Sequence, residues 1–249
     1  MSFRIGIYLL IFNFFSVLAP AQESSSNLAL LLGLDYGYQI PGGDLAKRFG
    51  PSFELGVNLN LMNLGKGYGL GIEGGFFFGN QVKEDVLKNL RTSDGGIIAN
   101  DKTFADAALR QRGWMAGLAV SKLFPLSAEN KGATLMIQLG SGILEHKIRI
   151  QDDPSKNVPI LREAYKSGFD RLSNGWYTKQ FIGFQSLASD RRINYYVGFE
   201  FVQAYTQGRR DFDFATQATL DEKRIDTLWG LKVGWILPFY FGDGREFFY

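Results

Sequence analysis

Large apolar side chains occupy every second position in several stretches of the chain, most clearly near its C-terminus. Between Arg224 and Tyr240, bulky apolar residues stand at alternate positions: Trp229, Leu231, Val233, Trp235 and Leu237. Glycine and lysine stand between them: Gly230, Lys232 and Gly234. A period of two residues over this length predicts a β-strand with one apolar face and one small or polar face.

The same alternation recurs along the chain and predicts eight strands. The other regular segments are 28–38, 53–61, 68–78, 113–121, 134–143 and 193–201. The sixth strand is expected at 176–187, where Ile182 and Phe184 share a face with Gln180. Beyond Leu144, in the fifth strand, the apolar residues move to even numbers. This shift indicates either a β-bulge or a strand that extends beyond the lipid.

The connections between the predicted strands alternate between long and short. Transmembrane barrels show this pattern, with short periplasmic turns and longer extracellular loops. A soluble lipocalin-like barrel is the alternative. It would place the larger apolar side chains inside an eight-stranded barrel, which has room only for modest ones. We therefore predict an all-β fold: an eight-stranded antiparallel up-and-down transmembrane β-barrel over residues 28–241. Its long extracellular loops would contain short helices near 82–90 and 160–165.

The two ends of the chain are expected to lie outside the barrel. Arg4, the apolar run 5–18 and the small residues Ala19 and Ala21 are typical of a secretory signal peptide over 1–21. An N-terminal membrane anchor is the alternative, but the run is short for a helical span. A polar lead over 22–27 and a tail over 242–249 complete the chain. This organisation predicts export with a cleaved Sec signal peptide to the outer membrane of a Gram-negative bacterium.

The amino-acid composition argues against several classes of function. The net charge of +2 over 249 residues predicts no nucleic-acid partner. With no cysteine and a single histidine, His146, we expect no metal site and no cofactor. A catalytic group at the barrel rim would have to use His146, which stands between Glu145 and Lys147 and is more typical of a packing or surface residue. We therefore expect no enzyme activity.

The last predicted strand also resembles the C-terminal signal by which bacterial outer-membrane barrels are recognised for assembly. Its spaced residues are Lys232, Gly234, Leu237 and Phe239. The barrel-assembly machinery is therefore an expected partner during biogenesis, and outer-membrane lipid is expected around the folded barrel. Pro238 is expected to mark the end of pairing in this strand, because proline lacks a backbone N–H.

Charged residues fall on the predicted interior face of the barrel. These are Asp35, Glu54, Glu73, Glu200 and Lys232, together with the polar Asn58, Asn60 and Gln138. Lys232 is expected to face Glu54, Glu73 and Glu200, and Lys179 or Arg112 could supply further positive charge. Two interpretations remain open. The charges form a packed polar network that plugs the barrel, or they form a path or gate for protons or small ions.

The two longest predicted loops carry apolar residues that a solvated loop does not need. Either the loops pack together as a lid over the barrel mouth, or they present a surface to another outer-membrane or periplasmic protein. The candidate partner contacts, including two in the tail, are Leu87, Leu90, Ile160, Tyr165, Phe248 and Tyr249.

The whole pattern resembles the small eight-stranded outer-membrane barrels of the OmpA/OmpX type. Four segments resemble an uncharacterised barrel family of the Bacteroidota: 80–85, 91–95, 146–153 and 233–240. The resemblance covers nearly all of the mature chain and implies no catalytic residue, and the chain lacks the separate peptidoglycan-binding domain of OmpA. It implies a structural, adhesion or accessory protein. We therefore expect a non-enzymatic barrel whose loops and tail bind protein partners, in a barrel-assembly or secretion complex. The alternative is a small-solute or ion channel gated by the interior carboxylates.

Overall fold

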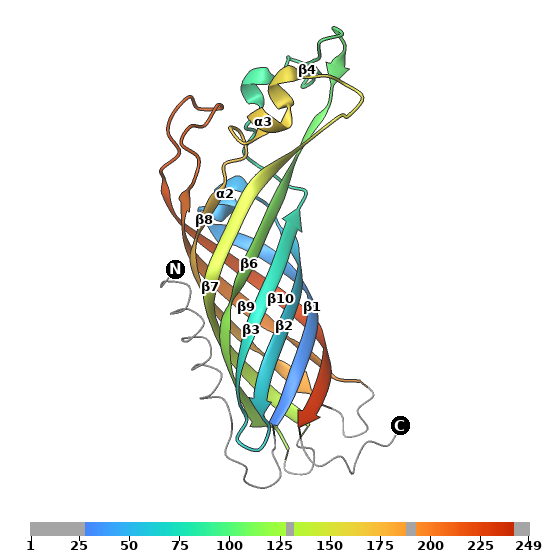
Figure 1. The fold of residues 1–249 in the computed structure, drawn as a ribbon, viewed down its shortest axis with the longest axis vertical. Helices are drawn as coiled ribbons and strands as arrows, with labels where there is room; N and C mark the ends of the chain where they lie inside the picture. The colour runs from blue at the N-terminus through green and yellow to red at the C-terminus, as the bar shows by residue number, and fades with distance from the viewer. Residues whose placement is uncertain (1–27, 128–131, 188–192, 242–249) are drawn as a thin grey trace, which may run out of the picture.

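Eight antiparallel strands close into a barrel in a computed structural model, which describes residues 28–127, 132–187 and 193–241 (Figure 1). The strands are β1 (Leu28–Gly43), β2 (Ser52–Asn63), β3 (Tyr68–Gly79), β6 (Ala107–Pro125), β7 (Ala133–Asp152), β8 (Ser173–Ser186), β9 (Tyr195–Gly208) and β10 (Lys223–Phe241). Each strand pairs with the next along the barrel, and β10 returns to pair with β1. The predicted eight-stranded up-and-down topology is confirmed.

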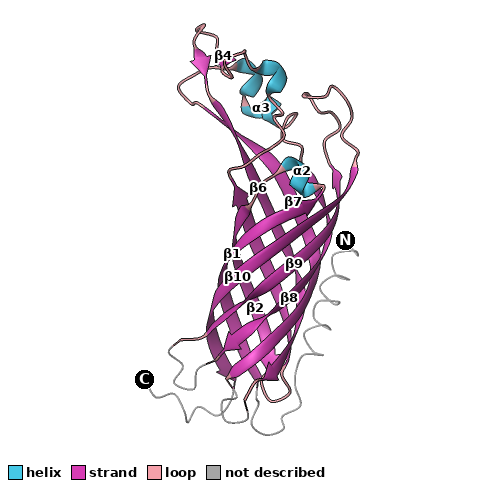
Figure 2. Cartoon of the chain, turned by 180° about the vertical axis from the view of Figure 1, so that it is seen from behind, coloured by secondary structure: helices cyan, strands magenta, loops and turns pink. Residues whose placement is uncertain are grey.

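All the long connections lie at one end of the barrel, which we call the loop end, and the short ones lie at the turn end (Figure 2). The loop end carries the small elements α2 (Leu45–Arg48), η1 (Lys88–Leu90), β4 (Ile97–Ile98), β5 (Phe104–Ala105), η2 (Pro159–Leu161) and α3 (Glu163–Lys166). The helix expected near 160–165 is present as η2 and α3. Among the described residues, no helix is long and apolar enough to cross a membrane.

The helix expected over 82–90 is wrong, because only a single 3₁₀ turn, η1, forms there. The Asp85 carboxylate accepts the Leu87 N–H at 3.0 Å and pairs with the Arg91 guanidinium at 2.8 Å. Such a local side-chain bond competes with helical hydrogen bonds. The apolar residues at helical spacing therefore pack from a turn rather than from a helix.

Strand β7 contains no bulge, although the apolar pattern shifts near Leu144. Its pairing with β6 runs without interruption from Ala107 opposite Asp152 to Pro125 opposite Thr134. Odd-numbered residues of β7 therefore face outward throughout. The apolar residues change face because this end of the strand lies beyond the apolar outer surface of the barrel and packs beneath the loops. The second of the two interpretations, a strand that extends beyond that surface, fits this register.

Two prolines, Pro41 and Pro238, lie within strands of the barrel. Strand β1 continues through Pro41 to Gly43, opposite β10. In β10, Pro238 lies opposite Leu31 and pairing runs to Phe241, so the expected end at Pro238 is wrong. The Ile236 N–H donates to the Asn194 carbonyl on the β9 side. The nitrogen of Pro238 points the same way, and Pro238 lies beyond the last described pair of β10 with β9, Trp235 opposite Tyr195.

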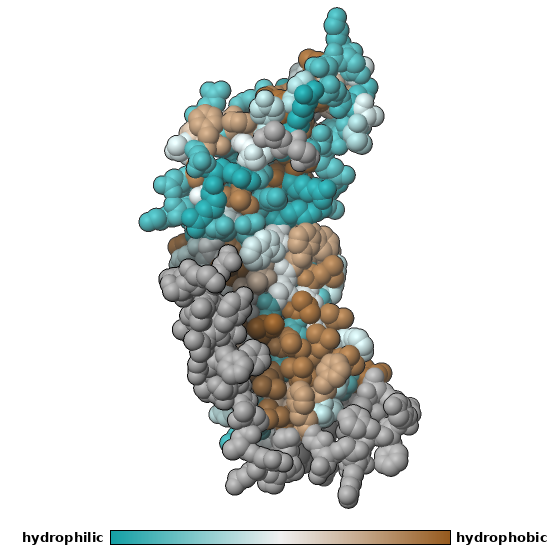
Figure 3. Space-filling model, viewed as in Figure 1, coloured by the Kyte–Doolittle hydropathy of each residue, from teal (hydrophilic) through white to brown (hydrophobic). Residues whose placement is uncertain are grey.

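The outer face of the barrel is apolar around its middle and the loop end is polar. Figure 3 shows a brown band over the strands and a hydrophilic surface above it. Large apolar side chains, among them Leu70, Ile72, Leu118 and Phe199, are more than half exposed on this band. On β8, the least regular predicted strand, Trp176, Ile182 and Phe184 share the outward face with Gln180 as expected.

The interior is filled by two apolar clusters at different levels. The lower cluster, near the turn end, contains Ala29, Leu31, Met62, Leu123, Met136, Phe181, Tyr196 and Ile236. The upper cluster joins inward-facing barrel residues such as Phe77, Ile148 and Leu228 to loop residues such as Leu45, Leu87 and Leu161. The loop end is thus closed by a hydrophobic core that is continuous with the loops, and we call this covering the lid.

Candidate functional site

A network of charged side chains lies inside the barrel, and Lys232 on β10 is at its centre. The Lys232 ammonium lies 2.7 Å from Glu200 and 3.0 Å from Glu54. It also lies 3.4 Å from Asp35. The side-chain amide of Gln39 donates to Glu54 at 2.5 Å and to Glu200 at 3.2 Å. Carboxylates from three other strands, β1, β2 and β9, therefore converge on one cation of β10.

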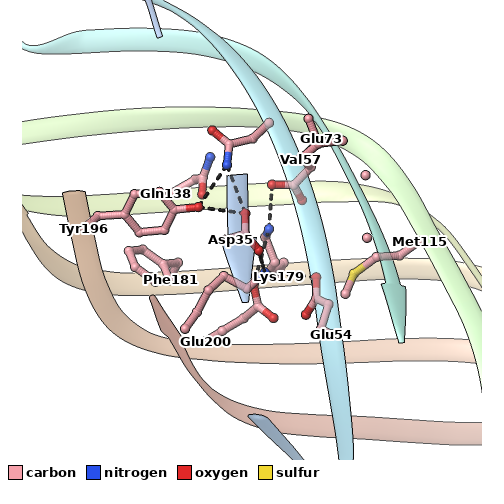
Figure 4. A pocket seen from close by; sticks show the side chains of 14 residues that line it. Asp35, Glu54, Val57, Glu73, Met115, Gln138, Lys179, Phe181, Tyr196 and Glu200 are labelled. Atoms are coloured by element: carbon pink, nitrogen blue, oxygen red, sulfur yellow. Dashed lines mark hydrogen bonds and ion pairs between the residues drawn. The ribbon is translucent and has the colours of Figure 1, made fainter. Parts of the chain in front are cut away.

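Glu73 does not face Lys232 as the sequence suggested. Its carboxylate instead pairs with Lys179 on β8, at 2.5 Å, and accepts the Tyr177 hydroxyl at 3.0 Å. Lys179 (Figure 4) also lies 3.4 Å from Glu200, so Glu200 is shared between Lys179 and Lys232. Arg112, the other cation considered, is outside the network. Its guanidinium donates to the backbone carbonyl of Gln111.

Asp35 is held by neutral donors as well as by Lys232. The Tyr196 hydroxyl donates to Asp35 Oδ2 at 2.7 Å, and the Asn58 amide donates to the same oxygen at 3.1 Å. Asn60 extends this chain by donating to Asn58 at 2.9 Å. The network holds four carboxylates and two ammonium groups, and its remaining bonds come from neutral side chains. Buried charged groups require such ion pairs and hydrogen bonds.

Glycine on the inner face makes room for these carboxylates. A Cβ at Gly56 would overlap the Asp35 carboxylate, and a Cβ at Gly140 would lie 2.7 Å from Glu73 Oε1. Glycine at these two inward positions is therefore a packing requirement of the network.

The network is enclosed between the two apolar clusters. It borders a small cavity lined by Asp35, Glu54, Glu73 and Lys179 among others. A second small cavity is lined by Asn60, Gln138, Gln185 and apolar residues of the lower cluster. The upper cluster, which is continuous with the lid, covers the network on the side of the loop end. A polar layer between two apolar layers resembles the core of a soluble domain more than the wall of a conduit.

His146 is fully buried beneath the lid rather than at an open rim. Its Nε2 lies 2.9 Å from Asp226, and Asp226 also accepts the Thr206 hydroxyl at 2.5 Å. The Phe49 ring packs edge-on against the imidazole, with 5.7 Å between ring centroids. The histidine thus packs between a carboxylate and an aromatic ring.

Arg48 on α2 fixes the first loop over the barrel mouth. Its buried guanidinium donates to the Arg171 carbonyl at 3.0 Å and to the Ser173 hydroxyl at 3.2 Å, and it pairs with Glu84 at 3.2 Å. Burial lowers the pKa of Arg48 to about 10, so the group stays charged at neutral pH. Glu84 also binds Arg171, which pairs with Asp213 at 2.9 Å. These contacts join all four long loops.

The candidate partner contacts differ in their exposure. Leu87 is 0% exposed and belongs to the lid core, so it offers no surface to a partner and that prediction is wrong. Leu90 packs partly against the same core. Ile160 and Tyr165 are exposed. Phe248 and Tyr249 lie outside the described residues, as do the signal peptide over 1–21, the lead over 22–27 and the tail.

The residues of the suggested assembly signal alternate across β10. Lys232 and Gly234 face the interior, and Leu237 and Phe239 face outward. A Cβ at Gly234 would overlap the Tyr196 ring, so both inward positions also have a packing role in the folded barrel. Recognition of these residues by assembly machinery stays a prediction.

Three contributors to the network were not predicted from the sequence. Gln39 shares the inward phase of Asp35, but the first strand was expected to end at Tyr38. Tyr177 lies on β8, whose alternation is weak. Tyr196 shares the inward phase of Glu200, but the sequence does not show that its hydroxyl reaches Asp35. Within the described ranges, His, Cys, Asp and Glu side chains do not gather in groups of three or more that could hold a metal ion.

No protein-family model matches the chain, and no curated protein matches it. Among solved structures, it is similar to Ail, the attachment invasion locus protein of Yersinia pestis, crystallised with the heparin analogue sucrose octasulfate. That match has 10% identity and a TM-score of 0.40, and covers 84% of this chain and 99% of Ail. A second Ail structure matches at 11% identity and a TM-score of 0.39, covering 84% and 98%.

The N-terminal β-barrel domain of Pseudomonas aeruginosa OprF is also similar, with 11% identity and a TM-score of 0.36, covering 86% of this chain and all of that domain. The expected membership of a Bacteroidota barrel family stays a prediction.

Proposed function

We propose that the chain is a non-enzymatic, integral outer-membrane β-barrel whose extracellular loops bind a protein partner. In this proposal the signal peptide over 1–21 directs export, and the loop end faces outward from the cell. The barrel is an accessory or structural subunit of an outer-membrane complex, such as a barrel-assembly or secretion machine.

The exposed apolar band supports the membrane location. Side chains such as Ile72, Leu118 and Phe199 are each 57% exposed or more on a surface that has no protein cover within the described chain. A band of this kind is unfavourable in water and favourable in hydrocarbon. Aromatic residues border it towards the loop end, where Phe53 packs with Tyr36, Tyr38 and Phe78. Such aromatic girdles are typical of the membrane interface.

One observation carries the partner-binding proposal: an exposed apolar pair at the tip of the second long loop. Ile98 on β4 lies opposite Phe104 on β5, and each side chain is 60% exposed. Their neighbours Ile97 and Ala105 point the other way, into the lid core. The two-stranded ribbon lies at the far end of the loops (Figure 1), and its second apolar face is exposed.

The third loop holds this tip in place. The Asn100 N–H donates to the Asn157 carbonyl at 3.0 Å, and Lys156 pairs with Asp101 at 3.3 Å. The Thr103 hydroxyl and backbone N–H, which both donate to Asp101, lower the pKa of this carboxyl to about 2, so the Asp101 carboxylate is charged at neutral pH. Ile160, from the third loop, is a further exposed apolar side chain of the lid. A preordered apolar surface binds a partner at a lower entropic cost than a flexible loop does.

The test is purification of the full chain from cell envelopes in a mild detergent, followed by mass spectrometry. We expect the folded chain in the outer-membrane fraction, starting after Ala21, with a stoichiometric partner. The double variant Ile98→Ser/Phe104→Ser should lose the partner. Leu126→Ser, which removes an exposed apolar side chain at the turn end, should keep it.

A wild-type chain that elutes alone would contradict the partner proposal, and so would a double variant that retains the partner. Membrane insertion is tested by a separate measurement, migration on a gel. A folded barrel migrates differently from the boiled chain on a gel, and both variants should show this difference. Recovery of the wild-type chain in the soluble fraction would contradict the membrane proposal.

A further inference from the structure

Four cations share the outer face of the hairpin formed by β6 and β7 near the loop end. Arg110 on β6 lies directly opposite Arg149 on β7, and Arg112 lies directly opposite Lys147. Lys147 and Arg149 are exposed, and the two β6 arginines are half-buried. We call these four residues the basic ladder.

The basic ladder begins where the apolar band ends. On the same outward face, the next cross-strand pair towards the turn end is Trp114 with Glu145, and the pair after that is Ala116 with Ile143. Both Trp114 and Ile143 are exposed on the band. Arg112 is two residues beyond Trp114, which is about 7 Å along a strand. The ladder therefore lies just outside the level of an interfacial tryptophan, where lipid headgroups lie.

Three acidic groups of the loop end pair with cations outside the ladder. Asp85 pairs with Arg91, Asp152 with Lys166 and Asp170 with Arg210. Glu145 lies on the same face as the ladder, but its oxygens accept the indole N–H of Trp114 at 3.1 Å and the amide of Asn174 at 3.3 Å.

Like charges directly opposite each other on a sheet destabilise it. Two such pairs in succession, with no ion pair to a carboxylate among the described residues, leave the face strongly positive. Guanidinium groups bind phosphate through two parallel hydrogen bonds, and lysine binds it as a point charge. The position and the charge thus match an anionic headgroup at the membrane surface.

We propose that the basic ladder binds the phosphate groups of a phosphorylated lipid in the leaflet that surrounds the loop end. The inference rests on the proposed membrane location, and it assigns to β6 and β7 a binding surface distinct from the apolar tip at Ile98 and Phe104. The lipid acyl chains lie against the apolar band, and the phosphates lie between the paired cations.

Binding is tested with the full mature chain, folded in maltoside micelles, which carry no phosphate. The probe is a bis-phosphorylated glycolipid, compared with the same glycolipid after removal of its phosphates. The double variant Arg112→Gln/Arg149→Gln should bind the phosphorylated probe at least about tenfold more weakly than the wild type, because it loses charge-assisted hydrogen bonds. Lys88→Gln/Lys102→Gln, which removes two exposed loop cations, should bind like the wild type.

Equal binding by the wild type and the Arg112/Arg149 variant would overturn the proposal. Equal binding of the two glycolipids would overturn it too. Inorganic phosphate at millimolar concentration should not displace the glycolipid. Full displacement would show a site for free phosphate and would overturn the assignment to lipid.

A second measurement separates binding from a structural role. In maltoside alone, Arg149→Gln should raise the unfolding midpoint, because it removes a like-charge contact with Arg110. With the phosphorylated glycolipid present, the same variant should be less stable than the wild type. A variant that is destabilised equally in both conditions would show a structural role only and would overturn the proposal. Because every variant is first shown to be a folded barrel, failure here leaves the proposed membrane location intact.

Discussion

The Lys232 ammonium lies 2.7 Å from the Glu200 carboxylate in the barrel interior, and both side chains are almost fully buried. Glu200 also reaches Lys179, and Lys232 also reaches Glu54. One ion pair therefore links two halves of a network that spans the barrel. Removal of one partner from a buried pair leaves an uncompensated charge, which costs more than the pair itself contributes.

Lys232→Met should destabilise the folded barrel by about 3–5 kcal/mol, because it leaves Glu54, Glu200 and Asp35 without their shared cation. The free energy of unfolding is measured by denaturant titration of the chain refolded in micelles. Glu54→Gln should cost less, because carboxylates outnumber lysines in the network. An unchanged unfolding midpoint for Lys232→Met would contradict this role.

Lys232→Met also distinguishes the two roles of Lys232, as the cation of the network and as part of the predicted assembly signal. Refolding in micelles proceeds without assembly machinery, so a defect there reports the network. A chain that refolds normally in micelles but is missing from the outer membrane of cells would instead support the predicted assembly signal. Phe239 faces outward, so Phe239→Ser leaves the network intact. It is the matched variant that tests the assembly signal alone.

Gly56→Ala should destabilise the barrel by about 1–3 kcal/mol, since its Cβ would occupy the space of the Asp35 carboxylate. Gly74→Ala is the control. Its nearest neighbour would be the Met115 carbonyl at 3.7 Å, an ordinary contact. Unfolding midpoints of the two variants give the comparison. Equal midpoints would show that interior space at Gly56 does not limit packing.

The barrel could be predicted from the sequence because its constraints are local. Alternation fixes the face of each residue, and Asp35, Glu54, Glu73, Glu200 and Lys232 all point inward as their phase requires. The partners of each charge could not be predicted, because they depend on the stagger between strands. Glu73 was assigned to Lys232, but the register brings it to Lys179.

The loops show a different reason for error. Leu87 and Ile98 are both apolar residues of one polar loop, and nothing in their spacing shows that one is buried and the other exposed. The distinction arises from contacts with other loops, such as the Arg48 bond to the Arg171 carbonyl. Side-chain bonds such as that of Asp85 also replaced an expected helix by a turn.

Leu87→Ser should loosen the lid without opening the barrel. Truncation of a large buried apolar residue lowers the free energy of unfolding by about 2–5 kcal/mol. Here the loss falls on a loop segment that can open locally. We expect faster protease cleavage within 80–106 and unchanged heat-modifiable migration. Ile98→Ser, at an exposed position of the same loop, should cleave at the wild-type rate. Equal rates for all three proteins would contradict the lid core.

The chain should form no steady conductance in planar bilayers, in the wild type or in Glu73→Gln. A permeating ion would have to pass the upper cluster beneath the lid and also the lower cluster, which includes Phe181 and Ile236. Transfer of an ion from water into an apolar layer is strongly unfavourable.

The recording uses the refolded chain at both polarities, with a wide barrel of known conductance to verify insertion. Steady wild-type current that changes in Glu73→Gln would establish the channel alternative instead. Brief currents that appear only in Leu87→Ser would have a different meaning. They would show that the lid core is the layer that blocks ions in the wild type, and that the lower cluster alone does not block them.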